Sequence, residues 1–171
     1  NSMLTGYCHS RQMVDAWHLF EQMPERNLVS WTVVISGYAR IEQHGKAWDI
    51  FRMMHREGVA PDQSNFASVL LAVTGLRDLG VLEGLRPLAL KTGFESDVVI
   101  GTSMLNAYTR DASALDTAMK FFEGMPERNE YTWSTMIAAL SHGGRIDAAT
   151  AVYERDPVKS IPCQTALLTG L

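Results

Sequence analysis

The chain has 171 residues, of which 46% are apolar and 20% charged, so it is long and apolar enough to bury a core. Its formal net charge of −4 argues against a protein that binds nucleic acid non-specifically, although it leaves room for a local basic stripe. No apolar run approaches the ~18 residues of a transmembrane helix. Two cysteines without a CxxC motif exclude a disulfide framework and favour a reducing compartment.

Four stretches of the chain carry the apolar spacing of one face of an amphipathic helix. Each contains an alanine with apolar residues three and four positions later, and three of them add a methionine at the seventh position. A second helical pattern precedes each alanine, which predicts helical hairpins around an apolar core. The alanines are Ala16, Ala47, Ala118 and Ala149, and the preceding patterns cover 3–7, 34–38, 104–108 and 136–140.

The pentapeptide Met-Pro-Glu-Arg-Asn occurs twice, at 23–27 and 125–129, and a tryptophan follows each copy four residues later. The copies are 102 residues apart, which divides into two units of 35 residues and one of 32. Glycine and proline residues at the helix ends mark the boundaries. We therefore predict repeat units over 1–27, 28–62, 63–97, 98–129 and 130–160, with a partial sixth unit over 161–171.

Hairpins of this period cannot bury their apolar faces alone, so they are expected to stack into one all-α solenoid over 1–171. Neither end carries a polar capping unit, which predicts an excised fragment or self-association through the ends. No signal or transit peptide is visible at Asn1, as expected of a mature fragment whose targeting segment lies outside it. Pro87, in the middle of an expected helix, predicts a kink.

Several segments resemble the pentatricopeptide repeat family. They are Val29-Ser30-Trp31, Ile35-Ser36-Gly37-Tyr38, Gly58-Val59-Ala60-Pro61-Asp62 and the two Met-Pro-Glu-Arg segments. The unit lengths more narrowly resemble plant arrays of P, L and S repeats, with 1–27, 98–129 and 130–160 as S-type, 28–62 as P-type and 63–97 as L-type. The tetratricopeptide pattern is absent. The resemblance implies a right-handed α-solenoid of helix-turn-helix hairpins that binds single-stranded RNA, one base per repeat.

The resemblance also implies that the fifth and the last residue of each repeat read the base. The pairs are Asn1 with Asn27, Thr32 with Asp62, Ala67 with Asp97, Thr102 with Asn129, and Ser134 with Ser160, and Thr165 opens a sixth site. An ionised aspartate only accepts hydrogen bonds, which suits G and U, whereas an asparagine amide donates and accepts, which suits A and C. Capping is the alternative for each residue alone, because Asp and Asn before a helix are ordinary N-caps.

In the family, threonine or serine at the fifth position goes with purines and asparagine with pyrimidines. The pairs then predict C, G, an unspecified base, A and a weakly specified purine, from 5′ to 3′. Ala67 has no polar side-chain atom, and Ser160 departs from the Asp/Asn choice, so the third and fifth units are expected to discriminate poorly.

Two further registers are expected to contact RNA. The second residues flank the bases, and apolar or aromatic side chains there can sandwich a base; they are Val29, Val99 and Tyr131, with Ser64 and Pro162 at the same position. The thirteenth residues form a candidate phosphate-facing stripe, namely His9, Arg40, Arg110 and His142, with Gly75 interrupting it. A solvated charged face is the alternative for any one arginine alone.

No catalytic, metal or cofactor motif is present: the five histidines lack HExxH or HxE partners, and the H-x-E…P-C-x-x-C deaminase signature is absent. The sequence therefore predicts a non-enzymatic solenoid without a cofactor, and the resemblance implies that this solenoid binds RNA. The resemblance implies that it selects a C-to-U editing site in a plant mitochondrion or plastid, with the mitochondrion favoured. The alternatives are an RNA processing or stability factor, or a protein-interaction scaffold that holds a helical partner such as an editing cofactor protein.

Overall fold

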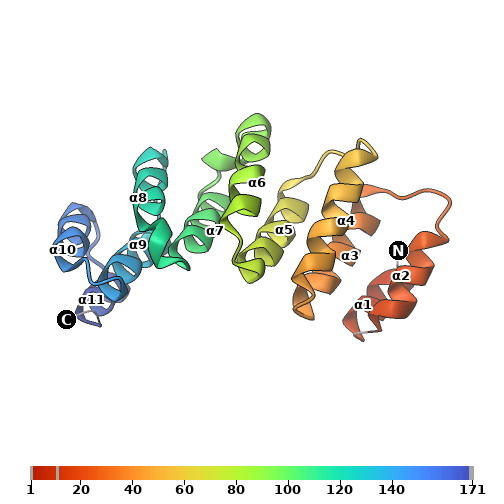
Figure 1. Ribbon diagram of the computed structural model, residues 1–171, viewed down its shortest axis with the longest axis horizontal. Coiled ribbons are helices and arrows are strands. Elements are labelled where there is room, and N and C mark those ends of the chain that lie inside the picture. The colour runs from red at the N-terminus through yellow and green to blue at the C-terminus, as the bar shows by residue number, and fades with distance from the viewer. Residues whose placement is uncertain (1, 11, 170–171) are drawn as a thin grey trace. The chain divides into compact units, whose positions relative to one another are not determined.

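The computed structural model describes residues 2–10 and 12–169, and these residues form eleven α-helices, two short 3₁₀ helices and no strand (Figure 1). The predicted all-α class is therefore confirmed. The chain divides into two compact units, Asn1–Leu76 and Arg77–Leu171. The single array over 1–171 stays a prediction, and each unit is described by itself.

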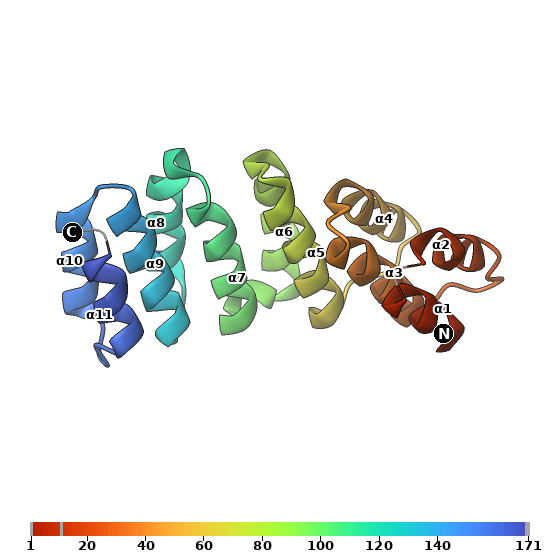
Figure 2. The same ribbon diagram turned by 90° about the horizontal axis from the view of Figure 1, so that it is seen from below.

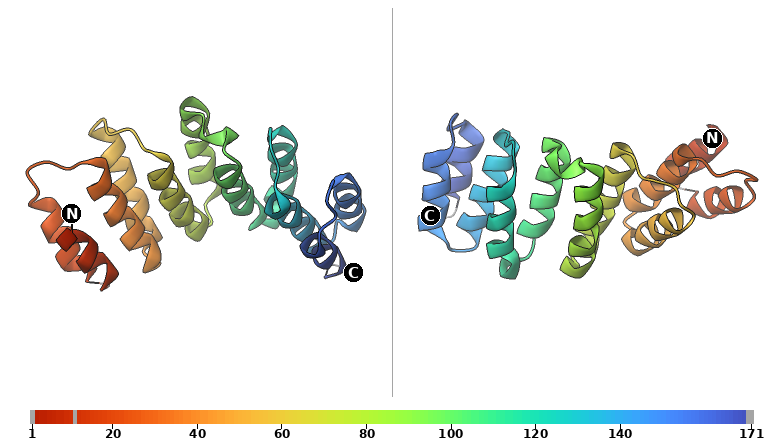
Figure 3. Two further views of the ribbon diagram at one scale, coloured as in Figure 1. Left: turned by 180° about the vertical axis from the view of Figure 1, so that it is seen from behind. Right: turned by 90° about the horizontal axis from the view of Figure 1, so that it is seen from above.

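The first compact unit holds five helices in hairpin order. They are α1 (Ser2–His9), α2 (Met13–Glu21), α3 (Leu28–Arg40), α4 (His44–Arg56) and α5 (Gln63–Leu76). α1 packs against α2, and α3 packs against α4, as predicted for helical hairpins. α3 also lies against both α1 and α5, so the first helices of successive units are neighbours (Figure 3).

The second compact unit repeats this arrangement. It holds α6 (Leu79–Thr92), η1 (Phe94–Ser96), α7 (Val98–Thr109), η2 (Ala112–Ala114), α8 (Leu115–Gly124), α9 (Glu130–His142), α10 (Ile146–Arg155) and α11 (Ile161–Leu168). α7 pairs with α8, and α9 pairs with α10. α9 also packs against α7 and α11, which places three first helices in a row (Figure 2).

First helices begin at the residues where the repeat units were expected to begin. α3, α5, α7, α9 and α11 start at Leu28, Gln63, Val98, Glu130 and Ile161. In the third unit, α6 continues through Pro87 as far as Thr92 and ends at Gly93, whose φ of 76° is a left-handed conformation that glycine adopts without a steric penalty.

The cores of the hairpins contain the apolar stripes read from the sequence. Ala16, Ala47, Ala118 and Ala149 are all fully buried. A methyl side chain lets two helix backbones approach closely, and the larger apolar residues one turn later fill the space beside it. Phe20, Phe51 and Phe122 are such residues, and all three are buried.

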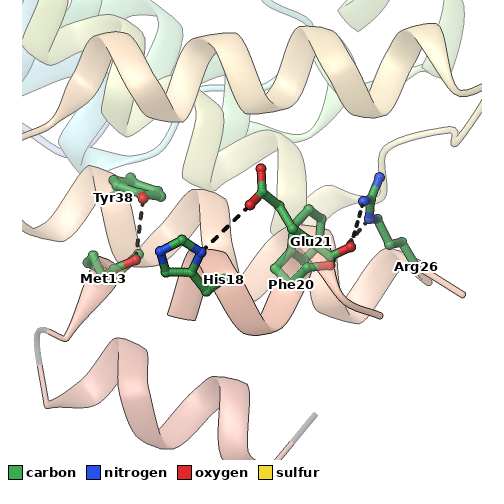
Figure 4. Close-up of polar contacts among 6 residues, drawn as sticks. All are labelled: Met13, His18, Phe20, Glu21, Arg26 and Tyr38. Atoms are coloured by element: carbon green, nitrogen blue, oxygen red, sulfur yellow. Dashed lines mark hydrogen bonds and ion pairs between the residues drawn. The ribbon is translucent and has the colours of Figure 1, made fainter. Parts of the chain in front are cut away.

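The arginine of each Met-Pro-Glu-Arg-Asn segment closes the preceding helix. Arg26 donates from Nε to the carbonyl oxygen of Phe20 and from Nη2 to that of Glu21, both at 3.3 Å (Figure 4). Its guanidinium also lies 5.1 Å from the ring centre of Phe20 and 5.9 Å from that of Trp31. The last carbonyl groups of a helix have no intrahelical partner, so this arginine satisfies two of them and covers two aromatic rings.

Arg128 makes the same contacts in the second copy. Its Nε and Nη2 each donate over 2.8 Å, to the carbonyl oxygens of Phe122 and Glu123. The guanidinium lies 4.8 Å from the Phe122 ring and 5.8 Å from the Trp133 ring. The recurrence of the pentapeptide with its tryptophan is therefore explained by one contact set that joins a helix end to the next first helix.

We expect Arg128→Ala to lower the free energy of unfolding by about 2 kcal/mol, because it removes two hydrogen bonds and a cation–π contact. Arg155→Ala is the matched control. Arg155 forms an exposed ion pair with Glu123 at 3.3 Å, which contributes about 0–1 kcal/mol. Urea unfolding followed by circular dichroism compares the two variants; equal losses would contradict the role given to Arg128.

Candidate nucleic-acid interface

The last residues of the first four repeat units cap the helices that follow them. Each Oδ1 accepts a backbone N–H from the first turn of the next first helix. The acceptor–donor pairs are Asn27 with Ser30 at 3.0 Å, Asp62 with Asn65 at 2.7 Å, Asp97 with Ile100 at 3.0 Å, and Asn129 with Thr132 at 2.9 Å. The capping interpretation of these residues is therefore correct for all four.

Capping uses only one atom of the head group, so it does not exclude base reading. In Asp62 the cap takes Oδ1 and leaves Oδ2, an acceptor, outside it. In Asn129 the cap also takes Oδ1 and leaves Nδ2, a donor, outside it. The cap thus holds the side chain in one orientation while its second polar atom takes no part in the bond.

The fifth residues direct their hydroxyl hydrogens into their own helices. Each bonds a carbonyl oxygen three or four residues earlier, as serine and threonine in helices commonly do. The distances are 2.8 Å from Thr32 to Leu28, 2.6 Å from Thr102 to Val98, 3.2 Å from Ser134 to Tyr131 and 3.0 Å from Thr165 to Ile161. With the hydrogen used in this way, the hydroxyl oxygen offers lone pairs to a neighbour.

A groove of about 500 Å³ lies where α7 and α9 meet, at the junction of the fourth and fifth repeat units. Four of its lining residues are those predicted for the fourth base site: Val99, Thr102, Asn129 and Tyr131. Val99 and Tyr131 expose 60% and 74% of their surface, so an apolar side chain and an aromatic ring flank the groove without being buried in the core. Ser103, Asn106 and Thr135 complete the lining and were missed by the sequence reasoning.

A second groove of about 520 Å³ follows where α9 meets α11. It contains Ser134, Pro162 and Thr165, which were predicted for the fifth and sixth sites, beside Ile161, Ala166 and Thr169. Thr135 lines both grooves, so the two are successive along the row of first helices. Ser160 is half-buried, makes no side-chain cap bond and does not line this groove.

In the first compact unit, Asn65 connects the two members of the second pair. Its backbone N–H donates to the capping oxygen Asp62 Oδ1, and its Nδ2 donates to Thr32 Oγ1 over 3.3 Å. Val29, the predicted flanking residue, exposes 56% of its surface. Of the other pairs, Asn1 lies outside the described residues, while Ala67 and Asp97 belong to different compact units and are not placed together.

The predicted phosphate stripe occupies the ends of first helices. Arg40 ends α3, Arg110 follows α7 and His142 ends α9, and all three side chains are exposed. The side chain of His9 lies outside the described part of the chain. These positions lie at C-terminal helix ends, where a cation is favoured by the helix dipole as well as being available to a phosphate.

The interruption of this stripe at Gly75 has a steric cause. A methyl group added at Gly75 would overlap the imidazole of His44, the first residue of α4. The half-buried His44 ring therefore occupies the space that a side chain at Gly75 would need, and its buried Nδ1 has no hydrogen-bond partner among the described residues.

The residues that the structure describes hold no candidate metal site, and the Cys163 thiol is protected by burial. Residues 2–10 and 12–169 contain no group of three His, Cys, Asp or Glu residues placed to hold a metal ion. Burial raises the pKa of the Cys163 thiol to about 11, so it stays protonated at neutral pH. Within the same residues no helix is long and apolar enough to cross a membrane. The hairpins define a helical-repeat protein.

Comparisons with known proteins assign this class to one family. The PPR repeat family profile matches residues 26–70, and the PPR repeat profile matches 1–28 and 131–155. A mitochondrial pentatricopeptide repeat-containing protein of Arabidopsis thaliana is 34% identical over 90% of this chain and 27% of its own length. A chloroplastic one from the same plant is also 34% identical, over 87% of this chain and 18% of its own length.

A solved structure has the same fold. The crystal structure of the pentatricopeptide repeat protein PPR10 in complex with an 18-nt psaJ RNA element aligns with a TM-score of 0.70 at 20% identity, over 96% of this chain and 26% of that one. The chain belongs to the pentatricopeptide repeat family and has its α-solenoid fold. It spans roughly a quarter or less of the length of the two plant relatives (27% and 18%).

We expect Gly75→Ala to lower the free energy of unfolding by about 1 kcal/mol, because the new methyl group displaces His44. In a His44→Ala background the same change should raise it by ~0.5–1 kcal/mol, the usual helix preference of alanine over glycine. At Gly6 an added methyl group would meet no atom outside its own helix within 4 Å, so Gly6→Ala should raise the free energy of unfolding in both backgrounds. Thermal unfolding of the four-member cycle decides; equal effects of Gly75→Ala in both backgrounds would contradict the steric explanation.

Proposed function

We propose that this repeat array binds single-stranded RNA sequence-specifically, with one base at each junction between successive first helices. The groove at α7 and α9 is the observation that carries the proposal, because it gathers both reading residues and both flanking residues of the fourth site. Membership of the family and the fold shared with PPR10, whose structure contains RNA, support it. The geometry of the reading pairs then allows a base to be assigned from donors and acceptors.

The second site is suited to G. Thr32 has its hydroxyl hydrogen on the Leu28 carbonyl, and Asp62 has Oδ2 outside the cap, so both members of the pair present acceptors. Guanine offers two adjacent donors on its Watson–Crick edge, the ring N–H and the exocyclic amine, whereas the other bases do not. A carboxylate beside a hydroxyl lone pair therefore favours G over A, which would place a ring acceptor against Asp62.

The fourth site is suited to A. Thr102 presents an oxygen whose hydrogen is donated either to the Val98 carbonyl or to Thr132, and Asn129 keeps its donor Nδ2 outside the cap. Adenine and cytosine both offer an exocyclic amine beside a ring acceptor, so one acceptor and one donor complement either base. Threonine at the fifth position goes with purines in the family, which favours A. Tyr131 and Val99 on the rims of the groove supply the stacking and apolar contacts that hold a base between them.

Affinity in this proposal comes largely from the phosphates. Arg40, Arg110 and His142 supply local charge in a protein whose net charge is −4, so the array is expected to bind RNA along one stripe and not over its whole surface. Specificity comes separately from the grooves, because phosphate contacts carry no sequence information.

We further propose that the bound RNA is organellar and that the array selects a C-to-U editing site. The relatives named mitochondrial and chloroplastic support a mitochondrion or a plastid, with the mitochondrion favoured. The alternation of unit lengths (35, 35 and 32 residues) supports a P, L and S array. Deamination of cytosine needs a zinc site, so in this proposal the array chooses the nucleotide and a separate deaminase acts on it.

The first test is Asp62→Asn, which should shift the preferred second base from G toward A by about tenfold. The new amide places a donor where the carboxylate placed an acceptor, while asparagine caps a helix as well as aspartate does. Binding is measured by fluorescence anisotropy on RNAs that differ only at that base. An unchanged preference for G would refute the assignment of this pair.

Asn129→Asp is the matched reverse exchange and should shift the fourth base from A toward G while leaving the second unchanged. A random single-stranded RNA pool gives the global control. If no sequence is enriched from the pool and a protein is retained tightly instead, the array is a protein-interaction scaffold and not an RNA reader.

The second test is Arg40→Ala, which should weaken all RNAs by a similar factor. It should also reduce the slope of log affinity against log salt by about 0.7, the value for one phosphate contact on a single strand. Arg56→Ala is the matched control, because Arg56 is an exposed arginine at the end of a second helix, α4. Equal effects of the two changes would contradict a phosphate stripe on the first helices.

A further inference from the structure

The third residue of three repeat units is polar and has no solvent-exposed surface. Ser30, Asn65 and Thr132 occupy this position in α3, α5 and α9, and each is 0% exposed. Burying a polar group costs free energy unless the group is hydrogen-bonded, so each of these residues is expected to have hydrogen-bond partners. For Asn65 and Thr132 the partners are both members of the preceding reading pair.

Thr132 bridges the two halves of the fourth pair. Its Oγ1 lies 2.7 Å from Thr102 Oγ1 and donates to Asn129 Oδ1 over 2.9 Å. It also accepts the backbone N–H of Asn129 over 3.2 Å, which completes a capping box. The buried hydroxyl group of Thr132 therefore contacts both members of the fourth reading pair, Thr102 and Asn129.

The number of hydrogens determines what this bridge leaves for a base. The backbone N–H and the hydroxyl of Thr132 both donate to Asn129 Oδ1, so the amide oxygen is turned inward by two donors. An exchange of the amide oxygen and nitrogen would set Nδ2 against those donors, so Nδ2 remains the outward group. Thr102 has its hydrogen on either the Val98 carbonyl or Thr132, and in both cases it offers the groove only a lone pair.

Asn65 does the same for the second pair by a different route. Its backbone N–H holds Asp62 Oδ1 at 2.7 Å, and its side-chain Nδ2 donates to Thr32 Oγ1 at 3.3 Å. Since Thr32 gives its own hydrogen to Leu28, it stays an acceptor, and the pair presents acceptors only. The Asn65 Oδ1 is buried without a hydrogen-bond partner among the described residues, a cost that a leucine of similar size would avoid.

The register of residue types along the chain agrees with this coupling. Where the fifth residue of a unit is Thr32 or Thr102, the third residue of the next unit is polar, Asn65 or Thr132. Where the fifth residue is Ala67, the third residue of the next unit is the apolar and buried Ile100. Both threonines are thus matched by a buried polar partner and Ala67 is not, whereas Ser134 is followed by the buried Cys163, which bonds the Glu130 carbonyl instead.

We propose that Asn65 and Thr132 are positioning residues for base recognition: each sets, from beneath the groove, which atoms of its reading pair face the RNA. This proposal rests on the RNA-binding function proposed above and deepens it. The specificity of a site then depends on three side chains, of which the third never touches the base. Two substitutions separate this role from an ordinary contribution to stability.

Thr132→Val keeps the shape of the side chain and removes the hydroxyl. We expect the preference for A over G at the fourth base to fall by about fivefold, the effect of losing one net hydrogen bond, while the preference at the second base stays. Thr150→Val is the control for a lost threonine hydroxyl, because Thr150 bonds only its own helix α10, through the Ile146 carbonyl. It should leave both preferences unchanged.

Asn65→Leu removes the donor to Thr32 and the unpartnered oxygen together, while the backbone cap to Asp62 remains. We expect the preference for G at the second base to fall by about fivefold. The thermal midpoint should stay or rise, because a buried unsatisfied oxygen is replaced by an apolar group. A purely structural residue would instead lower the midpoint and weaken all RNAs alike, and that result would overturn the proposal for Asn65.

Each preference is measured as the ratio of dissociation constants for RNAs that differ at one base. Wild-type protein without any base preference would refute the proposed function itself. Wild-type protein with preferences that both variants retain in full would overturn this inference alone. Loss of preference at the matched base only, with the other base as internal control, is the expected result.

Discussion

The side-chain helix cap at four of the repeat junctions is the interaction on which the rest of the structure depends. The first N–H groups of a helix have no carbonyl partner within that helix, so each first helix needs a hydrogen-bond acceptor just before it. Asn27, Asp62, Asp97 and Asn129 provide that acceptor. The same residues end the preceding units, so a requirement of helix formation places a polar head group at every one of these junctions. In Asp62 and Asn129 the cap uses Oδ1. The second atom is an acceptor, Oδ2, in Asp62 and a donor, Nδ2, in Asn129.

The contacts beside the cap explain why the junction is so similar in the two Met-Pro-Glu-Arg-Asn copies. Arg26 and Arg128 bond the last carbonyls of the helix before the junction and cover the aromatic ring of the helix after it. The backbone position of the asparagine that follows each arginine is therefore fixed relative to the end of the preceding helix. Lys159 lies over the Tyr153 ring at 5.6 Å and occupies the equivalent place before Ser160. A lysine has no planar fork with which to bond two carbonyls, and this third junction also lacks the side-chain cap.

Charge and recognition are separated in this fold. Exposed cationic side chains lie at the ends of first helices, whereas the grooves are lined by hydroxyl, amide, apolar and aromatic groups. In the proposed RNA-binding role, phosphate contacts and base contacts would therefore come from different residues of the array. In the third unit, Ala67 interrupts the polar residues at the fifth position and Gly75 interrupts the cationic residues at the thirteenth position.

The sequence by itself predicted the helical hairpins and the candidate base-reading residues, and the first helices start where its patterns place them. These properties are local: apolar spacing within one helix, glycine or proline at its ends, and Asp or Asn before its first turn. Tertiary structure alone decided which side chains share a groove, that Thr132 joins Thr102 to Asn129, and that His44 fills the space beside Gly75. Thr102 and Thr132 are 30 residues apart on different helices. No periodicity within a helix specifies which neighbour comes within hydrogen-bonding distance, because that depends on how two helices pack.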